Sequence, residues 1–281
     1  MSRALLAGLV DDAAVFPPGS APMPVAVPAH RYHLAAPYAE LIGPFLCPLD
    51  RVGELRAELR AGDRLAVGLI AGPDRAGLAD AVAAVQADGR LHLDRVELPL
   101  DAGGPAATVA AVDPLLAPDL PVWVELPWAD PGRSALAELQ ARQARRAERL
   151  EWPERAEWPE RPVYPKFRTG GAVVPPVGAL AERIAACHHG VPLPFKCTAG
   201  LHSAVRHDDA HGFLNVLVAS GVAARGGPVD EVAAALAETS ADRLVAGLRE
   251  VDTRGAFRSF GSCSVTEPLA DLAALGLWSP S

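Results

Sequence analysis

The feature of this sequence that most constrains its fold is a regular alternation between short apolar runs and longer segments rich in alanine and leucine. The runs have the length of buried strands, and the longer segments have helical periodicity. We therefore predict eight strands, at residues 5–10, 42–47, 65–70, 91–100, 121–126, 163–168, 193–198 and 213–218. Helices are predicted between them, at residues 49–60, 73–88, 106–116, 131–150 and 177–188.

Strands that alternate with helices pair in parallel, because each helix carries the chain back across the sheet. Eight such units predict an α/β fold of the closed (β/α)8 TIM-barrel type, and 281 residues are enough for one such domain. An open, doubly wound sheet is the alternative. Two connections fit the barrel less well: residues 21–38 are rich in proline, and residues 203–210 leave room for only about two helical turns.

We expect residues 1–281 to form a single barrel domain with two additions. The first is a surface-loop insertion at 151–162, where the tandem hexapeptides EWPERA and EWPERP place a proline in each copy. The second is a helical extension at 229–281, with helices over 229–236, 241–251 and from Thr266 to about residue 275. The segment FRSFGSCSV before Thr266 is interpreted as a plain connector.

The composition excludes several classes of function. The net charge is −8 and no basic stripe is interleaved with aromatic residues, so we expect no nucleic-acid partner. The apolar run at residues 4–10 is too short for a signal peptide or a membrane span, so we expect no membrane partner and a cytoplasmic protein. The four cysteines lack the CxxC spacing of zinc sites and do not form a disulfide framework.

Lysine is the most informative residue type in this chain. Lys166 and Lys196 are the only lysines, and the other 24 of the 26 basic residues are arginines. Since arginine supplies positive charge almost everywhere, lysine is expected where an amine is required, because arginine cannot lose its proton and act as a nucleophile. Both lysines lie late in predicted strands, where barrel enzymes build their active sites.

Other polar side chains occupy similar positions near the ends of the predicted strands: Asp11, Glu97, Glu125, Arg168, Thr198 and Asn215. Side chains two residues apart on a strand point to the same face. Arg168 should therefore share the barrel interior with Lys166, and Thr198 with Lys196, while Phe167 and Cys197 face the helices.

Two neighbouring lysines suit chemistry that depends on an amine of lowered pKa. Burial and a nearby cation both disfavour the ammonium form, so one lysine would become a nucleophile that attacks a carbonyl group and forms a Schiff base. The other lysine would supply the perturbing charge. Glu97 or Glu125 would move the protons, and Arg168 would hold a carboxylate or phosphate of the substrate through paired hydrogen bonds.

The motifs around both lysines resemble those of class I aldolases of the deoxyribose-phosphate aldolase type. Lys166-Phe-Arg-Thr169-Gly170 is similar to the Lys-x-x-Thr-Gly at the end of that family's sixth strand, and Lys196-Cys-Thr-Ala-Gly200 is a looser version of its seventh. The resemblance implies a barrel with Lys166 as the nucleophile, Lys196 as the group that perturbs its pKa, and Glu97 as the proton relay.

The chain also departs from this family. Glu97 stands where the family has a shorter aspartate, and Leu201 replaces a glycine of the seventh-strand turn. After the predicted eighth strand, a phosphate cradle would have to be built from Ala219-Ser220-Gly221.

Together, these observations predict a lyase that acts on a small carbonyl metabolite, carrying a carboxylate or phosphate, through a lysine Schiff base. No cofactor is expected, the expected partner is a small-molecule substrate, and a homo-oligomer is left open. The predicted catalytic residues are Lys166, Lys196, Glu97 and Glu125. The predicted substrate-binding residues are Asp11, Arg168, Thr169, Gly170, Thr198, Gly200, His202 and Asn215.

Three other interpretations stay open at the level of the sequence. The first is a metal-assisted lyase, isomerase or hydrolase, whose divalent ion would be bound by Asp11, Glu97, Glu125 and His202. The second is a barrel that binds a metabolite or a protein without catalysis. In the third, the two lysines pair with the glutamates in a buried ion network that is purely structural.

Overall fold

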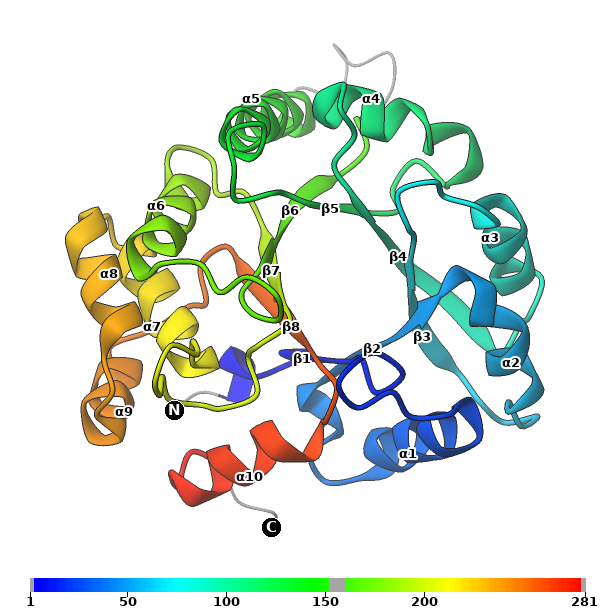
Figure 1. Cartoon of the computed structure of the whole chain (residues 1–281), viewed down its shortest axis with the longest axis horizontal. Coiled ribbons are helices and arrows are strands. Elements are labelled where there is room, and N and C mark those ends of the chain that lie inside the picture. Colours follow the sequence, from blue (N-terminus) through cyan, green and yellow to red (C-terminus); the bar gives the residue numbers. More distant parts are fainter. Residues whose placement is uncertain (1–2, 152–159, 279–281) are drawn as a thin grey trace.

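The computed structural model describes residues 3–151 and 160–278. Eight parallel strands form a closed barrel in sequence order, and Figure 1 looks into this ring with the helices arranged around it. The prediction of a (β/α)8 barrel is confirmed. The strands are β1 (Val10–Asp12), β2 (Ile42–Pro48), β3 (Leu65–Ile70), β4 (Leu91–Pro99), β5 (Val122–Glu125), β6 (Val163–Arg168), β7 (Phe195–Thr198) and β8 (Phe257–Ser262).

The helices cover the outer face of the barrel. They are α1 (Met23–Ala35), α2 (Val52–Ala57), α3 (Leu78–Gln86), α4 (Gly104–Ala110), α5 (Gly132–Glu151), α6 (Val177–His188), α7 (Phe213–Ala224), α8 (Val229–Ala237), α9 (Ala241–Arg249) and α10 (Thr266–Ala274). Short 3-10 turns occur at η1 (Arg3–Leu5), η2 (Ala39–Leu41), η3 (Leu49–Arg51) and η4 (Asp113–Leu115). Because the helices bury the outer face of each strand, the strands are apolar on that face and buried on both.

An aromatic row between the barrel and its helices aligns the strands that carry the lysines. The rings of Phe167 and Phe195 lie 5.5 Å apart, and those of Phe195 and Phe257 lie 5.3 Å apart. Phe167 also lies beside the guanidinium of Arg183 on α6, which confirms that it points outward. Since neighbouring residues of a strand face opposite ways, Lys166 on β6 and Lys196 on β7 point into the barrel.

The predicted eighth strand was wrong. Residues 213–218 begin α7, and β8 lies at Phe257–Ser262, within the segment interpreted as a connector. The apolar run at 213–218 fits a buried strand or a buried helix equally well. It forms a helix that is apolar on nearly every side, because α7 packs against α6, α8, α9 and β8 together.

Residues 229–281 are therefore not a helical extension beyond a finished barrel. Helices α8 and α9 belong to the long connection between β7 and β8, and in Figure 1 they lie outside α6 and α7. Strand β8 then closes the barrel by pairing with β1, with Val10 opposite Phe260 and Asp12 opposite Ser262.

The first strand also begins later than predicted. Residues 5–9 are largely buried but do not form a strand, and β1 covers only Val10–Asp12. Gly8 has a left-handed φ of 59°, which an extended strand does not allow. The apolar run at 5–10 thus marks burial rather than extended backbone.

Neither of the two connections that fit the predicted barrel less well prevents its closure. The proline-rich residues 21–38 contain α1, whose first turn accepts a proline because its N–H groups need no helical partner. Residues 203–210 contain no helix, and α7 begins after them. The predicted insertion at 151–162 falls mainly on 152–159, outside the described residues. In the described chain, no helix is long and apolar enough to cross a membrane.

The assignment of β8 predicts different effects for two neighbouring positions. Phe260 is fully buried and its ring stacks on Phe213 at 5.1 Å, whereas Arg258 is exposed. We expect Phe260→Ala to lower the free energy of unfolding by about 3–5 kcal/mol. Arg258→Ala should change it by less than about 0.5 kcal/mol. Urea unfolding of both variants measures the difference, and equally small effects would contradict a barrel strand here.

Candidate active site

The strand register brings charged side chains together near the carboxyl ends of neighbouring strands. On β5 and β6, Glu125 lies opposite Lys166, and on β6 and β7, Lys166 lies opposite Lys196. Strand β4 adds Glu97, which pairs in register with Trp123 of β5, two residues before Glu125. The carboxyl end of the barrel is where the loops that follow the strands can cover a ligand.

Glu97 lies between the two lysines. Its Oε2 atom is 3.3 Å from Nζ of Lys166, and its Oε1 atom accepts a hydrogen bond from Nζ of Lys196. Burial alone would raise the pKa of the Glu97 carboxyl, but the positive charges of Lys196, Lys166 and Arg95 outweigh it and lower this pKa to about 2. Glu97 is therefore an ionised carboxylate at any physiological pH.

The charged contacts continue from Lys196 into the closed part of the barrel. Nζ of Lys196 is 2.7 Å from Oδ2 of Asp11, and Oδ1 of Asp11 accepts a hydrogen bond of 2.7 Å from Nη2 of Arg95. Ser259 also donates to Asp11, at 2.8 Å. All four side chains are buried, so each polar group depends on these partners.

Arg95 and Ser259 are parts of this cluster that the sequence analysis missed. Arg95 precedes Glu97 by two residues on β4, so strand alternation places both side chains inside the barrel. That signal was present in the sequence. Ser259 could not be found in the same way, because its segment was not recognised as a strand.

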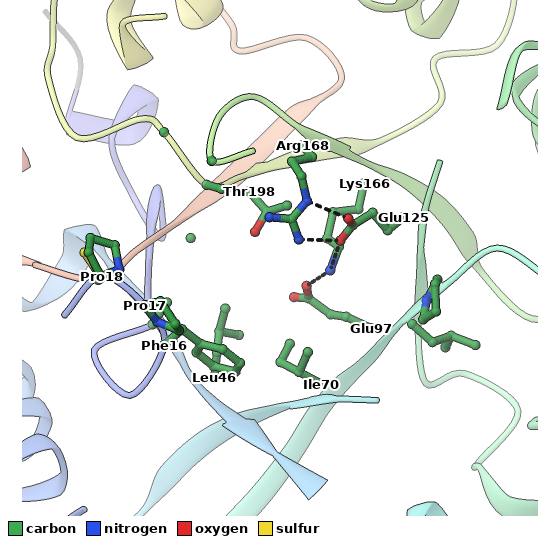
Figure 2. Close-up of a pocket in the computed structure, with 18 of the residues that line it drawn as sticks. Phe16, Pro17, Pro18, Leu46, Ile70, Glu97, Glu125, Lys166, Arg168 and Thr198 are labelled. Carbon is green, nitrogen blue, oxygen red and sulfur yellow. Dashed lines mark hydrogen bonds and ion pairs between the residues drawn. The ribbon is translucent and has the colours of Figure 1, made fainter. Parts of the chain in front are cut away.

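Toward the open end, the contacts pass from Lys166 to Glu125 and then to Arg168. Nζ of Lys166 is 3.0 Å from Oε2 of Glu125, and Oε1 of Glu125 accepts a 2.8 Å hydrogen bond from Nε of Arg168. Figure 2 shows this part of the cluster from the pocket. The Arg168 side chain is 44% exposed, so the contacts run from the barrel interior to solvent.

These side chains form one connected network of alternating charges, which we call the charge chain. Its members in order are Arg95, Asp11, Lys196, Glu97, Lys166, Glu125 and Arg168. Four of them are cations and three are carboxylates. Arg95 also lies 3.4 Å from Glu97 and 3.4 Å from Asp94, so the cations of the charge chain are balanced once Asp94 is included.

The expected effect of Lys196 on Lys166 is contradicted. Burial lowers the pKa of the Lys166 amine, but the carboxylates of Glu97 and Glu125 outweigh burial and raise this pKa above its usual value. Lys196 contacts the other oxygen of Glu97, so a carboxylate lies between the two ammonium groups. Lys166 is thus protonated in the ligand-free protein, and it can react only after passing a proton to a neighbouring group.

A cavity of about 790 Å³ opens beside Lys166. One side carries Glu97, Glu125, Lys166 and Arg168, and the side facing them carries Phe16, Leu46 and Ile70 (Figure 2). Such a combination of a few convergent polar groups with apolar walls is typical of small-molecule sites. Seven predicted site residues line this pocket: Glu97, Glu125, Lys166, Arg168, Thr198, Gly200 and His202.

The remaining predicted site residues do not line the pocket. Lys196 and Asp11 are fully buried behind it, where they hold Glu97 and Arg95. Neither can touch a ligand in this structure, so the prediction that Asp11 binds substrate finds no support. The other three residues, Thr169, Gly170 and Asn215, have structural roles.

Thr169 and Gly170 join the turns that follow β6 and β7. The Thr169 hydroxyl donates a 2.6 Å hydrogen bond to the carbonyl of Ala199, and its N–H donates to Thr198 at 2.8 Å. A Cβ atom at Gly170 would lie 2.5 Å from Cα of Gly200, so the two backbones touch where they cross. Both residues fix the pocket rim but do not line the pocket, whereas Gly200 does.

Asn215 was placed in the site because its segment was predicted to be a strand. It lies on α7, where its side-chain amide donates to the carbonyls of Ala235 at 2.9 Å and Glu238 at 2.7 Å. Its Oδ1 atom accepts from the N–H of Arg206 at 2.8 Å. Asn215 therefore ties α7 to the end of α8 and to the loop before α7.

The donor set for a metal ion is not assembled. Among residues 3–151 and 160–278, no three histidine, cysteine, aspartate or glutamate side chains are grouped to hold a metal ion. Asp11, Glu97 and Glu125 each contact a lysine or arginine, whose positive charge opposes a bound cation. His202 lies at the rim instead, 3.4 Å from Glu267. These contacts disfavour the metal-assisted alternative.

Comparison with known proteins identifies no relative. No family model matches the chain, and neither the curated proteins nor the solved structures contain a match. Only the site itself therefore indicates a function, because a barrel fold alone is compatible with many reactions.

The crossing of Gly170 and Gly200 predicts a loss of stability on adding one methyl group. We expect Gly170→Ala to lower the free energy of unfolding by about 1–3 kcal/mol, because the new Cβ overlaps the Gly200 backbone. Gly178→Ala is the matched control, since Gly178 is in α6 with open space around its Cβ position and should be neutral or stabilising. Thermal unfolding of both variants tests this, and equal melting temperatures would contradict the close approach.

Glu97 predicts a specific dependence of stability on acid. Its pKa falls from 4.5 to about 2 on folding, so its contribution to stability is complete above pH 4.5 and is lost as the pH falls toward 2. Glu97→Gln should lower stability at neutral pH by about 3–5 kcal/mol, because buried cations lose their partner.

The same Glu97→Gln substitution should flatten the decline in stability between pH 5 and pH 2, where the wild-type carboxylate takes up its proton. Urea unfolding at a series of pH values measures both effects. Glu182→Gln, at a half-exposed surface position, is the control that should keep the wild-type slope. A parallel slope for Glu97→Gln would show that Glu97 is not held ionised by the lysines.

Proposed function

We propose that this protein is a class I aldolase-type lyase, which makes or breaks a carbon–carbon bond in a small carbonyl compound through a Schiff base on Lys166. The observation that carries the proposal is the position of the Lys166 amine. It lies in the pocket wall, with Glu97 and Glu125 at 3.3 Å and 3.0 Å. An amine beside two carboxylates has proton acceptors within reach for each step of imine formation.

Lys166 is the better nucleophile of the two lysines. Lys196 has no exposed surface, does not line the pocket, and pairs with Asp11 and Glu97. A substrate carbonyl can reach Lys166 directly, whereas it would have to displace the buried network to reach Lys196. In this proposal Lys196 keeps Glu97 ionised and does not take part in bond formation.

Glu125 is the proton acceptor in this proposal. Glu97 faces three cations and has a pKa of about 2, so it is a poor base. Burial raises the pKa of Glu125, and the positive charges of Lys166 and Arg168 outweigh it, so its pKa is also lowered. Glu125, however, lies nearer to solvent, and one of its two cations is the partly exposed Arg168.

The proton balance of the first step follows from this arrangement. The Lys166 ammonium gives a proton to Glu125, and the lone pair freed on Nζ attacks the carbonyl carbon as the C=O π electrons move to oxygen. Two of the three ammonium protons leave with that oxygen as water, relayed by Glu125. The product is a protonated imine, and the negative charge of Glu97 at 3.3 Å from Nζ stabilises it.

The protonated imine then accepts the electron pair of the bond between the α-carbon, which is attached to the imine carbon, and the β-carbon, which bears a hydroxyl group. As this bond breaks, the α-carbon and the imine carbon become an enamine. Glu125 takes the proton of the hydroxyl group that becomes the new carbonyl. In the reverse direction the resulting enamine attacks an aldehyde and Glu125 returns the proton. The apolar wall of Phe16, Leu46 and Ile70 keeps bulk water away from the enamine.

The proposal predicts a covalent adduct that can be trapped. After incubation with acetaldehyde, propanal or pyruvate and a borohydride, intact mass and peptide mapping should find the reduced adduct on Lys166. Lys166→Arg should abolish it, because a guanidinium forms no imine. Arg133→Gln, at a position with an 82% exposed side chain, should leave it unchanged. An adduct confined to Lys196, or none on folded wild-type protein, would contradict the proposal.

A second measurement separates catalysis from mere binding. Enamine formation removes a proton from the carbon next to the carbonyl of the bound compound. In D₂O the wild-type protein should therefore catalyse exchange of this hydrogen for deuterium in propanal or pyruvate, which NMR follows. Lys166→Arg should not. Saturable binding without exchange would favour the non-catalytic alternative.

A further inference from the structure

Glu125 places Lys166 and Arg168 at a defined separation. Its Oε2 atom lies 3.0 Å from Nζ of Lys166 and 3.4 Å from Nη2 of Arg168, so these two nitrogens are no farther apart than the two contacts taken together. The Arg168 Nε also binds Oε1, so its guanidinium already holds a carboxylate edge-on. The site thus shows both a nucleophile and a carboxylate-binding group, with one carboxylate between them.

Resting on the proposed function, we propose that the substrate is a 2-keto acid with an apolar chain. Its carboxylate takes the place of Glu125 on Arg168, and its carbonyl carbon meets Lys166. In a 2-keto acid these two groups are directly bonded, so both fit the short separation between the amine and the guanidinium. A phosphate several bonds away from the carbonyl would extend past Arg168.

The charges of the site favour a single carboxylate. Arg168 is the partly exposed cation of the charge chain, and its guanidinium already holds one carboxylate, that of Glu125. A second pocket lies beside His202 and Cys263, which also line the main cavity, and the acidic residues Glu267 and Asp271 line it. Their negative charges disfavour a phosphate there.

The rest of the pocket indicates the substrate's chain. Phe16, Leu46 and Ile70 face the charged side across the cavity in Figure 2, and Leu98 and Pro99 add to the apolar lining. A cavity of about 790 Å³ is far larger than a three-carbon acid requires. Burial of each additional CH₂ group stabilises the complex, so a branched chain of several carbons fits better than a methyl group.

This substrate would also prepare its own nucleophile. Arg168 helps to lower the pKa of Glu125, so a substrate carboxylate that takes over Arg168 makes Glu125 a better base. Glu125, still beside Lys166, can then accept the ammonium proton. An aldehyde without a carboxylate leaves the Arg168–Glu125 pair intact and lacks this effect.

The test compares two compounds with the same chain, 4-methyl-2-oxopentanoate and 3-methylbutanal, by reductive trapping with cyanoborohydride. Comparing each compound between protein variants cancels its intrinsic reactivity. Arg168→Gln should raise the half-saturating concentration of the keto acid about 10- to 100-fold, because a bidentate charged pair is lost. The half-saturating concentration of the aldehyde should change by less than about 3-fold, the effect expected when a contact at the pocket rim is lost.

Four further measurements complete the design. Arg133→Gln should behave as wild type with both compounds. Arg168→Lys keeps the charge but loses the paired hydrogen bonds of the guanidinium. Its half-saturating concentration for the keto acid should therefore lie between those of wild type and Arg168→Gln. Pyruvate should require a higher concentration than 4-methyl-2-oxopentanoate for half-saturation with wild-type protein. Circular dichroism checks that each variant is folded.

The outcomes separate this inference from the proposed function. If wild-type protein traps the aldehyde on Lys166 but not the keto acid, or if Arg168→Gln weakens both equally, the keto-acid inference is overturned and the Schiff base stands. Tighter saturation by glyceraldehyde 3-phosphate than by either keto acid would also overturn it. Equal half-saturating concentrations of pyruvate and 4-methyl-2-oxopentanoate would overturn the inference that the substrate has an apolar chain. Trapping of neither compound class by wild type would overturn the proposed function itself.

Discussion

The structure depends on the pairing of charges inside the barrel. Taking an ionised side chain out of water costs several kcal/mol, and only close partners offset that cost. Lys196 has no exposed surface and relies on Asp11 and Glu97 from strands β1 and β4. The ends of β1 and β4 must therefore lie close enough for both carboxylates to reach the Lys196 amine. Closure of the barrel is what brings these side chains together, so the candidate site depends on it.

This dependence changes the roles of the two lysines. Glu97 lies between them, so each ammonium is stabilised by a carboxylate rather than destabilised by the other. A buried lysine with a raised pKa needs a proton acceptor before it can attack a carbonyl. In the proposed mechanism Glu125 accepts this proton, because it belongs to both the buried network and the pocket rim.

The sequence reveals the barrel and much of the site for identifiable physical reasons. Strands β2 to β7 are buried on both faces and stand out as short apolar runs, and the scarcity of lysine marks Lys166 and Lys196. The eighth strand was missed because Phe257–Ser262 is rich in small residues, whereas α7 is apolar on nearly every side. That error carried Asn215 into the predicted site.

The pairing of Asp11 with Arg95 could not be found either, because β1 and β4 are not neighbours and meet only across the closed barrel. No local pattern in the sequence records which side chains meet across that interior. The raised pKa of Lys166 has the same origin, since it depends on which side of Glu97 each lysine occupies.

The long excursion through α7, α8 and α9 before β8 has a consequence for synthesis of the chain. The hydrogen bond from Ser259 to Asp11 joins residues 248 positions apart, and contacts of such separation form late because a large loop must close first. While β8 is still inside the ribosome, β1 and β7 present bare edges, and Asp11 lacks Ser259. A nascent chain of this kind displays aggregation-prone strand edges for most of its translation, so we expect its yield in cells to depend on chaperones.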